Sequence, residues 1–169
     1  MENSSRRLPP SIDRRGFLRS VAGGTAAIGF VSLLPAGCAA DYPEAAGDGV
    51  PLRALSAKEY AVARAAAEAL LVEVPVDPAA IARDIDRELA LVGDPVRGDM
   101  KTVLVLIEHL TILGGRIRRF TALETADRLE ILRGWGRSRF GLRRAVYQST
   151  RAFVYFYAYA RDETRSITG

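Results

Sequence analysis

Residues 55–75, LSAKEYAVARAAAEALLVEVP, decide the fold class of this chain. Ser56 and Glu59 have the spacing of a capping box, in which the hydroxyl and the carboxylate each accept a backbone N–H bond at the start of a helix. The apolar residues that follow recur at positions i, i+3, i+7, i+10, i+11 and i+14, which is one face of a helix: Tyr60, Ala63, Ala67, Leu70, Leu71 and Val74. Pro75 then ends the helix, because proline cannot continue the hydrogen-bond ladder.

A second helix is predicted directly after this one. Asp77 and Pro78 are typical of an N-cap and the first helical position. Apolar residues spaced by four then mark one face: Ile81, Ile85 and Leu89. The triplet Gly93-Asp94-Pro95 is a break between helices.

The remaining segments also favour helices. Residues 100–115, MKTVLVLIEHLTILGG, are rich enough in β-branched residues for a buried strand, but their length favours a central buried helix. Thr121 and Glu124 have the spacing of a second capping box. Residues 140–163 contain no proline, and no glycine after Gly141. The sequence therefore predicts an all-α fold, a single compact bundle of about five helices over residues 56–169.

The residues before this domain have an ordered pattern of charged, uncharged and small side chains. Residues 13–19, DRRGFLR, place positive charge directly before the uncharged residues 20–34, and small residues follow at 36–40. This order is that of a secretory signal, and the apolar part is shorter than the about 20 residues of a membrane-spanning helix. The motif resembles the twin-arginine signal, and four positions match: Arg14, Arg15, Phe17 and Leu18. We expect residues 1–37 to be a twin-arginine signal peptide, read by the twin-arginine translocase, that exports the protein to the periplasmic face of the bacterial cytoplasmic membrane.

The end of the signal offers two modes of processing. Cys38 follows Ala36 and Gly37, which resembles a lipoprotein box and would make Cys38 the lipidated first residue of a membrane-anchored protein. Cleavage after Ala39 or Ala40 is the alternative. Cys38 is the only cysteine, so the chain forms no intramolecular disulfide. Residues 38–55 show no periodicity and carry prolines and glycines, so we expect a flexible tether.

The charge distribution argues against a nucleic-acid partner. The formal charge is +4, but residues 1–37 hold five arginines and two acidic residues, so the rest of the chain is near +1. Residues 38–99 carry twelve acidic against six basic residues, and residues 116–151 carry ten arginines against three acidic residues. This asymmetry predicts either oriented docking onto a partner or two faces that pair within the fold.

The sequence contains no evident catalytic, cofactor-binding or metal-binding constellation. His109, the only histidine, lies in the apolar segment, and a catalytic triad or most metal sites would have to use it. Its neighbour Glu108 points about 100° away on a helix, so we interpret His109 as a core residue with one hydrogen bond. Asp84 and Glu88 share a helix face, but the flanking arginines indicate a solvated surface.

The stretch AFVYFYAY, residues 152–159, is the most unusual feature of the domain. Its aromatic residues cover more than one helical face, which is typical either of a helix buried on several sides or of an exposed docking face. Arginines precede it, and arginine and tyrosine are common at interface hot spots. The candidate partner interface is therefore Arg139, Arg143, Arg144, Phe153, Tyr155, Phe156, Tyr157 and Tyr159.

These features together resemble the gluconate 2-dehydrogenase subunit 3 family. Residues 55–75 are similar to its opening pattern L-S-x-x-E … L-A-x-x-I-I-P, although Val72-Glu73-Val74-Pro75 replaces Ile-Ile-Pro. Residues 120–160 are similar to its pattern of arginines followed by a tyrosine pair, and a twin-arginine leader precedes both. The family commonly ends in Trp-x-x-Ile-Gly-Tyr-Pro-Gly, from which residues 164–169 depart, as expected if this terminal tail is truncated.

The resemblance implies a non-catalytic small subunit that supports export and maturation of a catalytic partner. It implies that the partner is an FAD-dependent dehydrogenase of the glucose-methanol-choline type acting on a sugar or sugar acid, with a cytochrome c subunit carrying haem c. It also implies that this chain binds no cofactor itself. Two alternatives remain: a lipid-anchored periplasmic helical binding protein, and a stand-alone exported enzyme that uses His109.

Overall fold

Helix α4, Ala57–Leu70, forms the centre of the fold. The computed structural model describes residues 42–49, 51–113 and 118–161, and within that part α4 contacts all the other helices. These helices are α3 (Glu44–Gly47), α5 (Pro78–Leu91), α6 (Asp94–Leu113), the short 3₁₀ helix η1 (Phe120–Ala122), α7 (Thr125–Gly136) and α8 (Gly141–Tyr159). Nine of the 14 residues of α4 are buried, and six of these are alanines. Alanine favours the helix and its small side chain lets neighbouring helices approach closely.

The predicted all-α class is confirmed. The described residues contain no strand, and five of their helices have 12 or more residues. Residues 100–113 belong to α6, so the strand alternative for this segment is wrong. The central position, however, belongs to α4 rather than α6, because α6 is exposed over its first turns and at Ile112.

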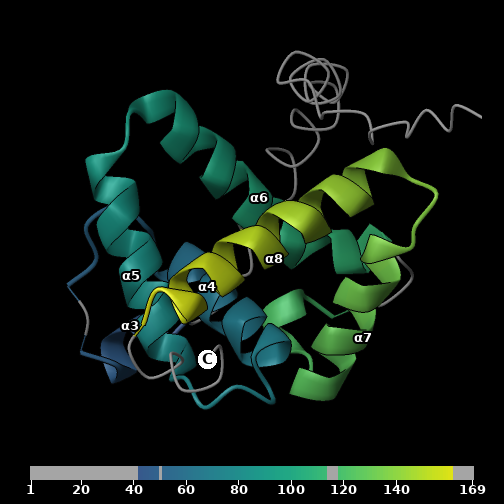
Figure 1. The fold of residues 1–169 in the computed structure, drawn as a ribbon, viewed down its shortest axis with the longest axis horizontal. Helices are drawn as coiled ribbons and strands as arrows, with labels where there is room; N and C mark the ends of the chain where they lie inside the picture. The colour runs from purple at the N-terminus through teal and green to yellow at the C-terminus, as the bar shows by residue number, and fades with distance from the viewer. Residues whose placement is uncertain (1–41, 50, 114–117, 162–169) are drawn as a thin grey trace, which may run out of the picture. The chain divides into compact units, whose positions relative to one another are not determined.

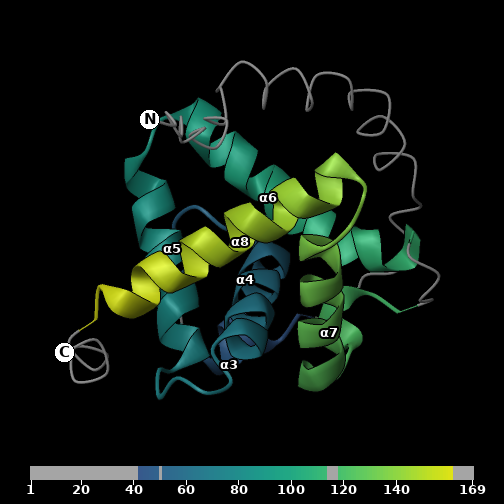
Figure 2. The ribbon, with the colours of Figure 1, turned by 45° about the vertical axis from the view of Figure 1, so that its right-hand side comes forward.

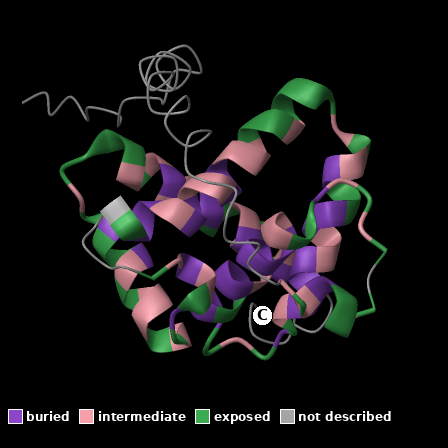
Figure 3. Ribbon diagram, turned by 180° about the vertical axis from the view of Figure 1, so that it is seen from behind, coloured by how far each residue is buried: buried purple, intermediate pink, exposed green. Residues whose placement is uncertain are grey.

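Helix α8 crosses α4, as Figures 1 and 2 both show. Its N-terminal end lies beside α7, and its C-terminal end lies beside α5. In Figure 3, buried residues gather where the helices meet, and exposed residues cover the connection between α5 and α6. One side of α8 therefore packs on the bundle, and the other is left at its surface.

The predicted start signals are confirmed for two helices and wrong for a third. The Ser56 hydroxyl accepts from the backbone N–H of Glu59 at 3.3 Å, and the Glu59 carboxylate accepts from the N–H of Ser56 at 2.7 Å. Asp77 likewise caps α5 by accepting from the N–H of Ala79 at 2.9 Å. Thr121 caps no α-helix, because its hydroxyl instead donates to the buried Glu108 carboxylate at 2.8 Å.

The described part of the segment predicted as a tether packs on the bundle. Ala45 in α3 and Leu55 before α4 are buried. The buried Asp86 carboxylate on α5 accepts backbone N–H bonds from residues 53–55 at 2.8–3.0 Å. Because these bonds fix the backbone, this part differs from a flexible tether. Residues 38–41 and residues 1–37, predicted to be a signal peptide, lie outside the described residues.

Candidate docking surface on helix α8

Helix α8 has one buried and one exposed face. Its most buried side chains are spaced by four residues: Val146, Thr150, Val154 and Ala158. Its opposite face is exposed along the whole helix, and we call this face the α8 stripe: Arg144, Gln148, Arg151, Ala152, Phe156 and Tyr159. The spacing of three and four residues keeps these side chains on one line along the helix.

The C-terminal half of the α8 stripe is aromatic. Phe156 is 67% exposed and Tyr159 is 53% exposed. Tyr155, half-buried beside them, stacks on Tyr159 with ring centroids 5.6 Å apart, and its hydroxyl donates to the Leu70 carbonyl at 3.2 Å. The guanidinium of Arg151 lies 5.5 Å from the centre of the Tyr155 ring, within the range of a cation–π contact. These contacts hold a preformed aromatic surface at the end of α8.

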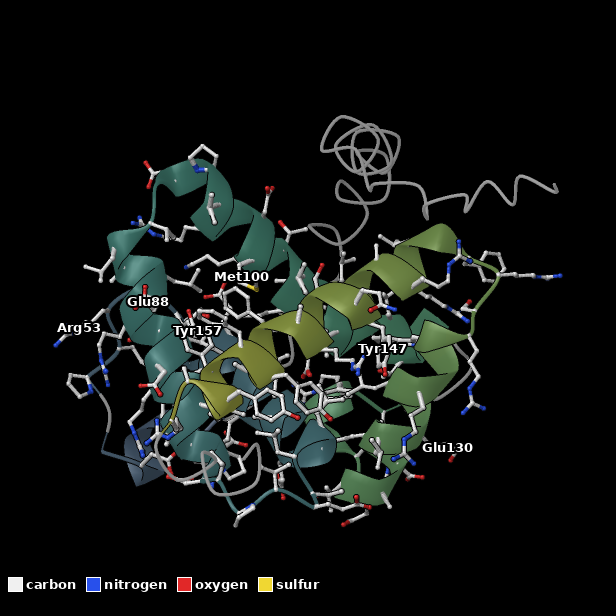
Figure 4. All side chains as sticks on the ribbon, in the orientation of Figure 1. Arg53, Glu88, Met100, Glu130, Tyr147 and Tyr157 are labelled. Carbon is white, nitrogen blue, oxygen red and sulfur yellow. The ribbon has the colours of Figure 1, made fainter. Side chains whose placement is uncertain are left out.

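The other two aromatic candidates pack inward. Phe153 and Tyr157 are half-buried and meet edge to face at 5.4 Å. Figure 4 shows Tyr157 near Glu88 of α5. Burial and the nearby carboxylates of Glu88 and Asp84 raise the pKa of Tyr157 to about 12, so its hydroxyl stays neutral at physiological pH. These two side chains lie on the side of α8 that faces the bundle, so they are not part of the α8 stripe.

The candidate arginines lie at the opposite end of the helix. Arg139 and Arg143 lie on either side of Phe140 in the chain, and their guanidinium carbons are 5.1 and 5.3 Å from the centre of its ring. Arg144 donates to the Ser138 carbonyl at 2.6 Å. Phe140 and Phe156 are 16 residues apart, which is about 24 Å along a helix. The structure therefore separates the arginines from the aromatic residues, and of the three arginines only Arg144 belongs to the α8 stripe.

His109 faces a lysine and no carboxylate. Its Nε2 atom lies 2.8 Å from Lys58 Nζ, and its buried Nδ1 has no hydrogen-bond partner within the described part of the chain. Burial and the Lys58 ammonium lower the pKa of His109, and the Glu108 carboxylate opposes this only in part. A neutral imidazole beside an ammonium group lacks the orienting carboxylate of a catalytic triad.

Glu108 is a fully buried carboxylate whose importance the sequence interpretation missed. It accepts hydrogen bonds from the Tyr42 hydroxyl at 3.0 Å and from the backbone N–H and hydroxyl of Thr121 at 3.0 and 2.8 Å. Arg119 donates to the Tyr42 oxygen at 2.9 Å. Burial and the Glu108 carboxylate raise the pKa of Tyr42 to about 12. A signal was present, because Glu108 shares a helical face with apolar Leu104.

Asp84 and Glu88, which share a face of α5, do not form a joint site. Asp84 pairs with Arg87 at 3.3 Å and also with Arg161, while Glu88 is exposed. No group of three or more His, Cys, Asp or Glu residues within the described ranges could hold a metal ion. An apolar cavity between α4, α5, α6 and α8 measures about 10 Å³, which is the size of one water molecule.

The residues predicted to form the export signal, and Cys38, lie outside the described residues. No helix of the described part is both long and apolar enough to cross a membrane. Comparison of the chain with protein-family models, curated proteins and solved structures finds no match.

Proposed function

We propose that this protein is the non-catalytic small subunit of an exported FAD-dependent dehydrogenase of the glucose-methanol-choline type, which oxidises a sugar or sugar acid. In this role it binds the folded catalytic subunit and supports its export and maturation through the twin-arginine signal. The catalytic subunit carries FAD, and a cytochrome c subunit carries haem c.

The exposed aromatic end of α8 is the observation that carries the proposal. Phe156 and Tyr159 leave large apolar side chains in water, although full burial of a phenylalanine is worth about 1.5–3 kcal/mol. Arg151 and the Tyr155 hydroxyl are already positioned by contacts within the domain. A preformed surface loses little conformational entropy on binding, and tyrosine and arginine are typical of interface hot spots.

The two alternatives receive less support from the geometry. A stand-alone enzyme would use His109, whose Nε2 faces the Lys58 ammonium instead of a serine or carboxylate. A binding protein needs a pocket of about 300–1,000 Å³ for a small molecule. The apolar cavity that described residues of α4, α5, α6 and α8 line is far smaller, about 10 Å³.

The first experiment tests the docking surface. The tagged chain is expressed together with a candidate flavoprotein dehydrogenase of the glucose-methanol-choline type, and the flavin that copurifies is measured by its visible absorbance. The variant Phe156→Ala/Tyr159→Ala should lose at least about 30-fold in affinity, since a hot-spot residue contributes about 2 kcal/mol or more. The matched control Val72→Ala/Leu91→Ala removes two other exposed apolar side chains and should copurify flavin as the unchanged chain does.

The second experiment tests shared export. With Arg14→Lys/Arg15→Lys, both chains should remain in the cytoplasm, and sugar-dependent dye reduction in the periplasm should disappear. Periplasmic flavoprotein activity that persists in this variant would contradict the proposal. Activity of the purified chain alone that His109→Ala abolishes would establish the enzyme alternative instead.

A further inference from the structure

The turn between α7 and α8 carries a basic cluster at the opposite end of α8 from the aromatic residues on which the proposed function rests. Residues 131–151 contain six arginines and no aspartate or glutamate. We call the cluster at this turn the arginine corner: Arg133, Arg137, Arg139, Phe140, Arg143 and Arg144. Figures 1 and 2 show the α7–α8 connection at the edge of the bundle.

The positive charge of the arginine corner is not compensated within the described part of the chain. None of its five arginines forms an ion pair with a carboxylate there. By contrast, Arg128, further from the turn on α7, pairs with Glu68 at 2.9 Å and also donates to two backbone carbonyls. The corner therefore concentrates positive charge that no carboxylate of the described residues neutralises through an ion pair.

An apolar tip lies among these arginines. Phe140 is 52% exposed, and Leu142, two residues further, is 43% exposed. The guanidinium groups of Arg139 and Arg143 contact the Phe140 ring, which fixes cations beside an exposed aromatic side chain. The bond from Arg144 to the Ser138 carbonyl holds the turn in this shape.

We propose that the arginine corner binds an anionic phospholipid surface. Phe140 and Leu142 enter the interfacial layer, where aromatic and apolar side chains are favoured next to cations. The guanidinium groups bind headgroup phosphates, which match their planar fork of donors. Arginines lie both before and after Phe140 in the chain. In a headgroup layer, phosphates surround an inserted ring on all sides, so each of these arginines can reach one. This surface lies about 24 Å from the aromatic end of α8, so one face can bind lipid while the other binds a partner chain.

The test uses the full chain and a reporter at the corner itself, because the leader is also basic and apolar. Phe140→Trp places an indole in the corner, and Trp135, the only native tryptophan, is buried and provides a constant background. The probes are vesicles of phosphatidylcholine alone or mixed with phosphatidylglycerol, with brominated acyl chains as quenchers. We expect a blue shift and quenching with the mixed vesicles only, and loss of both at high salt. The control Leu91→Trp places the reporter on α5 and should show neither.

A charge variant tests the arginines. Each arginine near an anionic surface contributes about 1 kcal/mol, so Arg139→Gln/Arg143→Gln should weaken binding to mixed vesicles about 30-fold. The control Arg53→Gln/Leu91→Ser, at exposed positions outside the corner, should bind as the unchanged chain does. Equal binding by the charge variant, or quenching that is the same in neutral vesicles, would overturn the proposal. The proposal would also be overturned if the protein bound polyglutamate or DNA tightly while the indole of Phe140→Trp showed no change with vesicles. That result would indicate a surface for soluble polyanions.

Discussion

Replacing Asp86 should release residues 53–55 from the bundle and lower the stability of the whole domain. The Asp86 carboxylate is 3% exposed and accepts backbone N–H bonds from Arg53, Ala54 and Leu55 at 2.9, 3.0 and 2.8 Å. In Asp86→Asn the side chain keeps one oxygen and turns an NH₂ group toward at least one of these donors. A hydrogen bond to a charged group contributes about 1.5–3 kcal/mol. Loss of one bond and weakening of the others should therefore lower the free energy of unfolding by about 2–4 kcal/mol.

Urea denaturation followed by far-ultraviolet circular dichroism measures this change. Asp99→Asn is the matched control, because Asp99 is exposed and forms no side-chain ion pair with a described residue, so the same substitution there should cost less than about 0.5 kcal/mol. Hydrogen exchange locates the effect, since the amide protons of residues 53–55 should lose protection in Asp86→Asn before the helices do. The reasoning fails if both variants unfold at the same urea concentration, or if exchange at residues 53–55 does not change.

Two further predictions concern the α7–α8 contact and the histidine. A Cβ at Gly136 would lie 2.7 Å from the ring of Tyr147, which Figure 4 shows between α8 and α7, so Gly136→Ala should destabilise the protein by about 1–3 kcal/mol. Gly134→Ala, with open space around its Cβ, should stabilise α7 by about 0.5–1 kcal/mol, and thermal unfolding that ranks the two variants the other way would contradict the packing. The lowered pKa of His109 means that, as pH falls through about 6.5, the unfolded chain gains a proton that the folded chain does not. The free energy of unfolding should therefore decrease between pH 7.5 and about 5, and His109→Asn should make this decrease smaller; an identical pH profile would show that His109 does not contribute.

Local signals in the sequence predicted the helices well. The capping box at Ser56 and the Asp77-Pro78 pair depend on groups within three residues of one another, so the sequence shows them directly. The central place of α4 was harder to predict, because alanine is only weakly apolar and its role is to let other helices approach. The apolar segment 100–115 suggested a central helix. The helix that the others pack against is instead α4, whose buried residues are mostly alanines.

Long-range polar contacts could not be predicted from spacing. Asp86 binds residues 31–33 positions away, and Glu108 binds Tyr42 across 66 positions. Thr121 then leaves its expected capping role, because a buried carboxylate without donors would cost more than an uncapped helix end. The aromatic run at 152–159 left open whether its helix is buried on several sides or exposes a docking face, and only the packing of α8 determines that Phe156 is exposed while Phe153 is not.

The Tyr42–Glu108 bond limits how far the chain can be trimmed. Lipidation at Cys38 and cleavage after Ala39 or Ala40 would all leave Tyr42 in the mature protein, only a few residues from its new start. A shortened version that begins at Ser56 would instead remove the Tyr42 donor from Glu108 and all three amides that Asp86 binds. Glu108 would keep only its bonds to Thr121, and Asp86 would be left as a buried carboxylate without these donors. A recombinant version should therefore retain Tyr42 and the residues that follow it, well upstream of the first long helix.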